Sequence, residues 1–205
     1  MKGRKMAVVA VTLLVFTASA GLTGAYLTDV PEKLENSITP GSVDVELTET
    51  KWNPEEARQL LPGSTVQKNP AAKNTGKNEA WIFLKVQIPV KELCTVDTVT
   101  KKKEGKAEKE LFAFTAKDAW ELVGKEREEA GVTYLYGYRS VVQPQETTET
   151  LFEEVTLVNY LEGELDETDS LSIPVEAMAI QTNVCAADAT LQDIYEQYLQ
   201  QKKAA

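Results

Sequence analysis

The chain lacks histidine altogether, although it is 205 residues long. Histidine is the general base of Ser-His-Asp triads and a ligand in zinc motifs of the His-Glu-x-x-His type, so both kinds of active site are excluded. Glycine-rich loops placed to hold a phosphate are missing as well. We therefore expect a protein without catalytic residues, without a bound metal and without a cofactor.

Basic residues are in the minority. The chain has 22 Lys and Arg against 32 Asp and Glu, for a net charge of −10, and its first 25 residues contain three of the basic residues and no acidic one. The 180 residues that follow thus carry a charge of −13 and favour a single domain, 26–205. A surface of this sign repels nucleic acid and anionic membranes, so we expect neither as a partner.

Only two cysteines occur, Cys94 and Cys185. Each follows a predicted strand, and a chain exported to an oxidising compartment can join two such cysteines in a disulfide. Two unpaired thiols are the alternative, and both states stay open at the level of sequence.

The chain has one long apolar run, at its start. Basic residues precede it, residues 6–16 are almost entirely aliphatic, and small residues follow up to Ala25. This order is typical of a secretory signal peptide. Thr23 and Ala25 are small residues three and one positions before Tyr26, which suits a signal peptidase. We therefore predict that residues 1–25 form a signal peptide that is cleaved between Ala25 and Tyr26.

Two alternatives concern the same segment. Residues 6–28 form an uncharged span of 23 residues, which is long enough for an uncleaved anchor, because a bilayer needs about 20 apolar residues. Residues 18–20, Ala-Ser-Ala, offer an earlier cleavage site. Because the second half of the span is rich in Gly, Thr and Ser, cleavage is the better interpretation. The protein then contacts the membrane only through its leader.

The rest of the chain shows mostly strand patterns. Alternating or β-branched runs bounded by glycine and proline predict strands at 42–49, 66–73, 81–88, 132–142, 150–160 and 171–180. Pro70 favours an edge position for residues 66–73. Many short strands joined by such turns predict an all-β fold, a jelly-roll-like antiparallel β-sandwich.

One or two short helices are expected beside the strands. Residues 115–123 begin with Thr115 three positions before Asp118, which is the spacing of a capping box. Residues 188–201 predict a C-terminal amphipathic helix that docks on the domain's own core, because five apolar or aromatic residues share one of its faces: Leu191, Ile194, Tyr195, Tyr198 and Leu199.

Three further patterns suit binding surfaces, and each also has a plainer structural interpretation. Acidic residues at 162–169 offer oxygen ligands for Ca²⁺, but their spacing is not that of an EF-hand, and a charged loop explains them equally well. The lysine-rich residues 100–110 predict a solvated loop. For the aromatic residues we favour core packing over a glycan platform: Trp52, Trp81, Trp120, Tyr134, Tyr136 and Tyr138.

The segment LTGAYLTD at the leader junction resembles the corresponding junction of the TasA/camelysin family of exported bacterial proteins. Further patches are similar to that family: ITPGSVDVELTET (38–50), LLPGSTVQKNPAAKNTGKNEAWIFLKVQI (60–88), and LFEEVTLVN with IPVEAMAIQTN (151–183). The resemblance implies a jelly-roll-like sandwich, a dedicated signal peptidase, and assembly into fibres on the cell surface or in the biofilm matrix. Some members are described as metalloendopeptidases, and the lack of histidine departs from that activity.

In fibre-forming members of the family, the N-terminal strand freed by cleavage inserts into the next subunit. The resemblance implies this role for residues 26–38, whose side chains alternate between two faces with Pro31 as an interruption. The residues assigned to strand donation are Tyr26, Leu27, Thr28, Val30 and Ile38.

These observations predict a secreted structural subunit of extracellular matrix or pilus-like fibres, with signal peptidase and further copies of itself as partners. A head-to-tail contact made by a donated strand does not close on itself, so it extends into a filament. The alternatives are a camelysin-like cell-surface metalloprotease and a monomeric surface-binding module.

We expect the secreted protein to begin at Tyr26, because Thr23 and Ala25 provide the small side chains that a signal peptidase requires. The intact mass of protein recovered from culture supernatant checks this. A secreted species that retains Met1, or one that begins at Gly21, would contradict the predicted cleavage site.

Overall fold

The structure, a computed structural model, describes residues 42–53, 55, 60–165, 171–184 and 188–204. The predicted leader, its cleavage site and the donor segment 26–38 lie outside these residues, as does Cys185. The described strands are β1 (Val45–Glu49), β2 (Thr65–Gln67), β3 (Pro70–Asn74), β4 (Ala80–Ile88), β5 (Val90–Leu93), β6 (Ala107–Glu110), β7 (Phe112–Ala113), β8 (Trp120–Glu128), β9 (Gly131–Tyr138), β10 (Glu154–Leu157) and β11 (Val175–Gln181). A short 3₁₀ helix, η2 (Thr182–Val184), and a helix, α2 (Leu191–Ala204), follow them.

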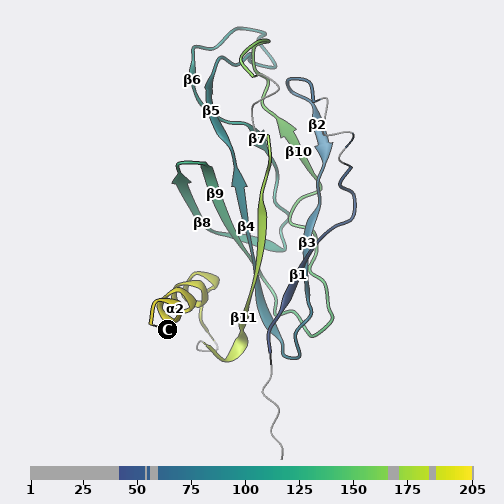
Figure 1. Ribbon diagram of the computed structural model, residues 1–205, viewed down its shortest axis with the longest axis vertical. Helices are drawn as coiled ribbons and strands as arrows, with labels where there is room; N and C mark the ends of the chain where they lie inside the picture. The colour runs from purple at the N-terminus through teal and green to yellow at the C-terminus, as the bar shows by residue number, and fades with distance from the viewer. Residues whose placement is uncertain (1–41, 54, 56–59, 166–170, 185–187, 205) are drawn as a thin grey trace, which may run out of the picture. The chain divides into compact units, whose positions relative to one another are not determined.

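The largest sheet has four strands in the order β11-β4-β9-β8, and every neighbouring pair is antiparallel (Figure 1). β4 lies between β11 and β9, and both of its faces are buried. Its residues Ile82, Leu84 and Val86 belong to the main core, whereas Phe83 belongs to a second cluster on the opposite face. This alternation follows from the two-residue period of a strand.

The second layer consists of shorter pairings, β1-β3 and β2-β10-β7, with a separate β5-β6 hairpin. Val66 of β2, Ala72 of β3 and Val155 of β10 are buried in the same core as Leu84 of β4. Two antiparallel layers therefore enclose one core, and the predicted all-β, sandwich-like class is confirmed. The jelly-roll strand order stays a prediction.

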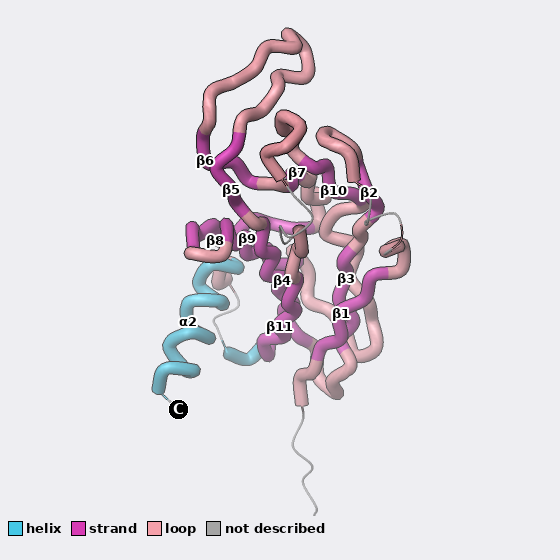
Figure 2. The backbone as a smooth tube through the Cα atoms, turned by 45° about the horizontal axis from the view of Figure 1, so that its top comes forward, coloured by secondary structure: helices cyan, strands magenta, loops and turns pink. Residues whose placement is uncertain are grey.

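Helix α2 covers the outer face of the four-stranded sheet beside β8 and β9 (Figure 2). Thr190 caps it, since the backbone N–H of Asp193 donates to Thr190 Oγ1 at 3.2 Å and Thr190 N–H donates back to the Asp193 carboxylate at 2.9 Å. Leu191 and Ile194 are buried against Phe83. The C-terminal amphipathic helix and its docking on the domain's own core are thus confirmed, with the helix starting three residues later than predicted.

The helix predicted at 115–123 is wrong. The chain turns at residues 117–120, where Trp120 N–H donates to the Lys117 carbonyl, and then enters β8. Trp120 is buried opposite Tyr138 on β9, and its indole N–H donates to the Glu149 carbonyl at 3.1 Å. Pairing with an aromatic neighbouring strand outweighs the weak local preference for a helix.

Two other local predictions need correction. Residues 66–73 form two strands in different sheets, and β3 is bonded on both sides, to β1 and to the segment 145–151. Pro70 is tolerated because it opens β3, where its missing N–H is not required. Residues 100–110 are not entirely loop, since Ala107–Glu110 form β6 against β5. Because β6 consists of one alanine and three charged residues, no alternation of apolar and polar residues predicts it as a strand.

The tyrosine row on β9 packs within the sandwich rather than forming a binding stripe. Phe114 makes edge contacts with the rings of Tyr134 and Tyr136 at centroid distances of 5.6 and 6.0 Å. Tyr138 packs against Trp120 at 5.0 Å. The interpretation of these residues as core aromatics is therefore confirmed.

Gly131 provides a test of how closely the start of β9 approaches the end of β4 within the four-stranded sheet. A Cβ atom at this position would lie 2.2 Å from the Ile88 carbonyl oxygen, and a backbone atom cannot rotate away. We expect Gly131→Ala to lower the free energy of unfolding by about 1–3 kcal/mol, the usual cost of overpacking. Urea denaturation of the purified protein measures this.

Gly105→Ala is the matched control, because no heavy atom lies within 4 Å of a Cβ atom there. This substitution should shift the free energy of unfolding by no more than about 0.5 kcal/mol. Equal unfolding midpoints for the two variants would contradict the close approach of Gly131 to Ile88.

Candidate functional site

The cysteine and acidic-loop predictions are only partly covered by the described residues. Cys94 has a buried thiol that forms no disulfide with a described residue, and its hydrogen bond to Glu164 together with burial raises the pKa of that thiol. Because Cys185 lies outside the described residues, the Cys94–Cys185 disulfide stays a prediction. Of the predicted Ca²⁺ loop, Asp166, Glu167 and Asp169 also lie outside.

No three His, Cys, Asp or Glu side chains gather to hold a metal ion within the described ranges. No helix of the described chain is long and apolar enough to cross a membrane.

Strands β1 and β11 face each other across an unpaired seam. Among the described strands, β1 pairs only with β3 and β11 pairs only with β4, yet the two strands approach each other (Figure 1). No backbone hydrogen bond joins them among the described residues. An unpaired strand edge presents a row of N–H and C=O groups that can pair with another strand. We call these facing edges and the adjoining groove the β1/β11 seam.

The side chains along the seam leave part of the core uncovered. Val45 and Leu47 of β1 and Val175, Ala177 and Ala179 of β11 pack on the main core, but each stays only half-buried. An apolar row of this kind is favourably covered by a further strand, since burial stabilises by about 25 cal/mol per Å².

At one end the seam widens into a groove of about 430 Å³. The groove lies between the end of β1 and the segment that leads into β11, and its lining is largely apolar: Glu49, Trp52, Leu60, Val66, Lys68, Phe112, Val155, Leu171, Ser172 and Ile173. Trp52 is 41% exposed, so the prediction that it packs in the core is wrong, and its ring is available to a ligand at the groove. The sequence patterns pointed to none of these residues as a groove, because they come from six separate segments.

The opposite edge of the four-stranded sheet is different. β8 contains a bulge between Leu122 and Gly124, and its second half is charged, with Lys125 and Arg127 paired to Glu110 and Glu108. Bulges and charges are devices that natural sheets use against edge pairing. No bulge interrupts the pairing of β1 or β11, and each carries one exposed glutamate, Glu46 and Glu176, between the apolar side chains of the seam.

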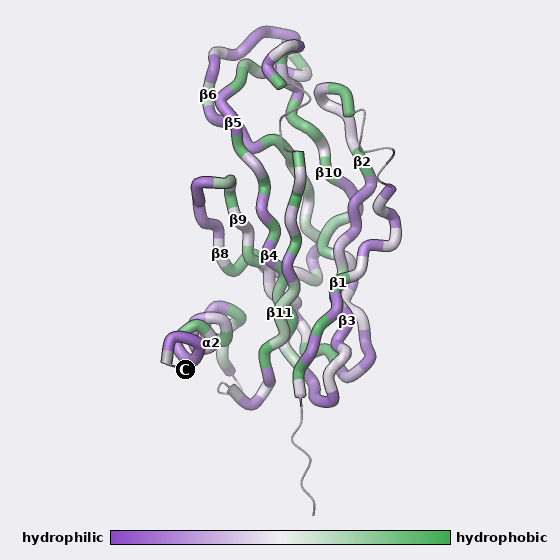
Figure 3. Tube along the Cα trace, viewed as in Figure 1, coloured by the Kyte–Doolittle hydropathy of each residue, from purple (hydrophilic) through white to green (hydrophobic). Residues whose placement is uncertain are grey.

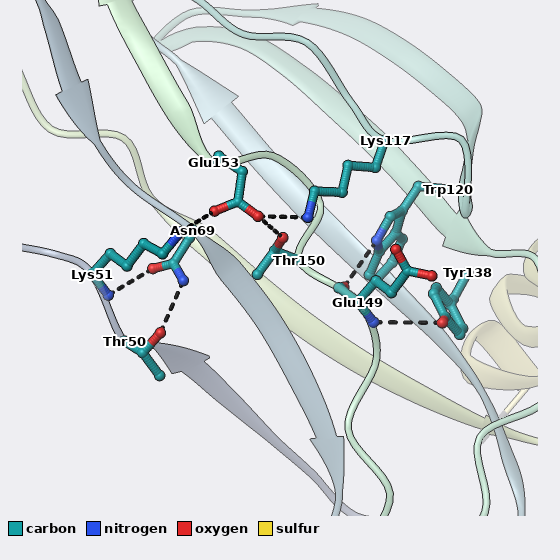
Figure 4. A network of polar contacts seen from close by, with 9 residues as sticks. All are labelled: Thr50, Lys51, Asn69, Lys117, Trp120, Tyr138, Glu149, Thr150 and Glu153. Carbon is teal, nitrogen blue, oxygen red and sulfur yellow. Dashed lines mark hydrogen bonds and ion pairs between the residues drawn. The ribbon is translucent and has the colours of Figure 1, made fainter.

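A network of polar contacts fixes the end of β1 beside the groove (Figure 4). Asn69 Oδ1 accepts the Lys51 backbone N–H at 2.8 Å, and Asn69 Nδ2 donates to Thr50 Oγ1 at 2.9 Å. The Lys51 ammonium lies 2.7 Å from the Glu153 carboxylate. These contacts hold residues 50–51 against β3 and the segment before β10, and so position Trp52 at the groove.

Glu153 is the centre of that network. Hydrogen bonds from Lys117, Lys51 and Thr150 favour its charged form and lower its pKa from 4.5 to about 2. The Thr150 hydroxyl contributes at 2.8 Å, and Lys117 donates from the opposite side to Lys51 (Figure 4). One carboxylate thus joins three segments of the second layer.

An ion pair lines the apolar groove. Lys68 Nζ lies 2.7 Å from Glu49 Oε1, and the Lys68 residue is only 7% exposed. The ammonium also lies 5.0 Å from the centroid of the Trp52 ring. Removing one partner of a buried pair leaves an uncompensated charge, so Glu49 and Lys68 stabilise the groove only together.

Comparison with known proteins finds no matching family model, no matching curated protein and no matching solved structure. The resemblance to the TasA/camelysin family therefore stays a hypothesis, and the candidate site is argued from its geometry alone.

We expect Glu153→Gln to lower the stability of the folded protein most at neutral pH. A carboxyl group whose pKa is lowered by folding stabilises the native state above its ordinary pKa of 4.5, and this contribution is lost as the pH falls towards about 2. The gap in urea midpoint between wild type and variant should therefore be wide at pH 7 and narrow at pH 2.5.

Glu154→Gln is the control, since the neighbouring Glu154 is exposed and makes only a 3.5 Å contact from Gln67. Its midpoint should follow the wild type at every pH. A gap for Glu153→Gln that stays constant with pH would contradict the role of the charged network.

Proposed function

We propose that this protein is a secreted structural subunit that assembles into extracellular fibres by strand donation, with residues 26–38 of one copy inserting into the β1/β11 seam of the next. The observation that supports it most is the seam itself. Two sheet edges face each other without hydrogen bonds, half-buried core residues line them, and an apolar groove extends them.

A donated strand suits this seam on physical grounds. Its backbone would pair with the free edge of β1 or β11, and its alternate side chains would enter the groove, which is the general mode of recognition by strand addition. Tyr26, Val30 and Ile38 are the apolar side chains proposed to fill it. Leu27 and Thr28 lie between them in the donor.

The segment before β1 is also long enough to reach another copy. Sixteen residues, 26–41, separate the proposed new end from Ser42. Fully extended, they span roughly 50–60 Å at 3.3–3.6 Å per residue. Because the donor becomes a free end only after export, cleavage between Ala25 and Tyr26 would restrict polymerisation to the outside of the cell.

The export leader, the secreted location and the TasA/camelysin membership belong to the same proposal. The metalloprotease alternative has no supporting observation among the described residues. The alternative of a monomeric binding module stays compatible with the groove, which would then take a segment of a foreign protein. The fibre-subunit and binding-module hypotheses differ in whether the purified protein polymerises.

We expect purified protein 26–205 to form filaments, and a version that lacks residues 26–37 to stay monomeric and folded. Negative-stain microscopy and sedimentation measure assembly, and circular dichroism verifies the fold. A tag left in front of Tyr26 should hinder assembly, because it blocks entry of the donor. Identical filaments from the deleted form would contradict strand donation, and monomers under all conditions would favour the binding module.

The acceptor side has its own matched pair of variants within the same assembly experiment. Ile173→Asp places a charge in the groove and should prevent filaments without unfolding the half-buried site. Leu122→Asp makes a similar change at a 49% exposed position on β8 and should leave filaments intact. Equal behaviour of the two variants would place the acceptor elsewhere.

A further inference from the structure

The β5-β6 hairpin has a rigidly built tip. Asp97 Oδ1 accepts the backbone N–H groups of Val99 and Thr100 at 3.0 and 2.5 Å, together with the Thr100 hydroxyl at 2.8 Å. Lys101 N–H donates to the Asp97 carbonyl, and Lys101 adopts a left-handed φ of 57°. The loop between the strands is therefore a fixed turn that presents its side chains outward.

Residues 99–106 of the tip contain four lysines and one glutamate, Glu104, and so carry a net positive charge. Lys101, Lys102, Lys103 and Lys106 are exposed, and none forms an ion pair with a described residue. On the body of the domain, by contrast, most basic side chains are paired: Lys51, Lys68, Lys85, Lys117, Lys125, Arg127 and Arg139 each lie within ion-pair distance of a glutamate. Figure 3 shows the hydrophilic colouring along β6 and the adjoining tip.

Two exposed apolar side chains lie at the same end of the domain. Val99 at the tip is 85% exposed and Leu61 in a neighbouring turn is 72% exposed. Asn159 links the two loops, since its side chain donates to the Val96 carbonyl at 2.7 Å and lies about 3.5 Å from a Cβ built on Gly63. Exposed apolar side chains beside the lysines offer a protein partner contact area that a bare polyanion would not use.

The opposite end of the domain carries three acidic side chains, Asp44, Glu79 and Glu146, against one lysine, Lys77. There the turn 75–79, the turn 143–146 and residues 42–44 are joined by hydrogen bonds, such as Lys77 N–H to the Ser42 carbonyl and Gln143 Nε2 to Glu79. Asp44, Glu79 and Glu146 form no ion pair with a described lysine or arginine. β4 begins at this acidic end, and the chain then continues through β5 to the basic tip (Figure 1).

From this arrangement we infer that the basic tip, residues 99–106, contacts the acidic end of the next copy, which is formed by residues 42–44, 75–79 and 143–146. The inference rests on the proposed fibre function and assigns it a second contact surface, separate from the β1/β11 seam. The proposed donor segment leaves the domain at Ser42, within the acidic end. A subunit that donates its strand therefore presents its acidic end towards the acceptor.

Electrostatics gives this contact a function that strand donation lacks. Copies of the cleaved chain, each with a net charge of −13, repel one another, so their association needs a localised attraction. A basic tip and an acidic end on one molecule orient the approaching subunits head to tail before the donor finds its groove. The contact thus sets the polarity and the rate of assembly, and the seam sets its strength.

The test is the elongation rate of preformed filaments by purified protein 26–205. At about 20 mM salt, Lys102→Glu with Lys103→Glu should slow elongation by about tenfold or more, the lower range of steering effects. The matched control, Lys202→Glu with Lys203→Glu near the end of α2, carries the same charge change and should stay within about twofold of wild type. The difference should shrink at about 0.5 M salt, where exposed charges are screened.

A charge exchange identifies the partner surface. Adding Asp44→Lys and Glu79→Lys to the slow variant should restore its rate, because the two reversed surfaces attract again. A slow variant that this exchange does not rescue overturns the assignment of the acidic end.

An unchanged rate for Lys102→Glu with Lys103→Glu overturns the inference while leaving strand donation intact. If that variant elongates normally but loses retention on polyphosphate, the tip serves a polyanion and the inference is equally wrong. If wild-type protein forms no filaments, the proposed function fails and the contact with it.

Discussion

The burial of β4 on both of its faces is the constraint on which the rest of the domain depends. Ile82, Leu84 and Val86 require the second layer of strands above them, and Phe83 requires cover on the opposite face. Helix α2 supplies that cover through Leu191 and Ile194. β9 and β11 then complete the two ladders of β4, so one strand organises a strand layer, a helix and two neighbours.

The same arrangement leaves β11 with a free outer edge. A sandwich of separate sheets has more edges than a closed barrel, and each edge must be protected, covered or used. β8 is protected by a bulge and by charged residues, whereas β1 and β11 present half-buried apolar side chains to one another. The proposed donor strand would cover the half-buried apolar side chains of β1 and β11 that pack on the main core.

The distribution of charge complements this arrangement of strand edges. Ion pairs such as Lys51–Glu153 and Arg127–Glu108 hold neighbouring segments of the domain together, and four lysines that form no ion pair with a described residue lie close together at one tip. A donated strand and an oriented end contact are independent interactions. Together they would give a filament both stability and direction, which neither supplies alone.

Periodicity in the sequence was sufficient for β4, β9, β11 and α2, because each buries a continuous apolar face that is visible within ten or fifteen residues. It failed for residues 115–123, where a capping-box spacing competed with a cross-strand pair, Trp120 and Tyr138, that is formed only in the folded chain. It also missed β6, whose charged side chains leave no apolar pattern, and placed Pro70 at an edge that β1 occupies instead.

The candidate groove could not be predicted from short-range sequence patterns, for a related reason. The groove combines Trp52, Val66, Phe112 and Ile173, and its ion pair joins Glu49 to Lys68, so its existence depends on how distant strands are brought together. The amino-acid sequence by itself determined the strand-rich composition, the absence of histidine chemistry, the acidic charge and the amphipathic helix, since these follow from residue types and short-range spacing. Only the tertiary structure decided which edges stay unpaired and which lysines lack partners, because hydrogen bonds and ion pairs between distant segments are made by packing rather than by neighbours in sequence.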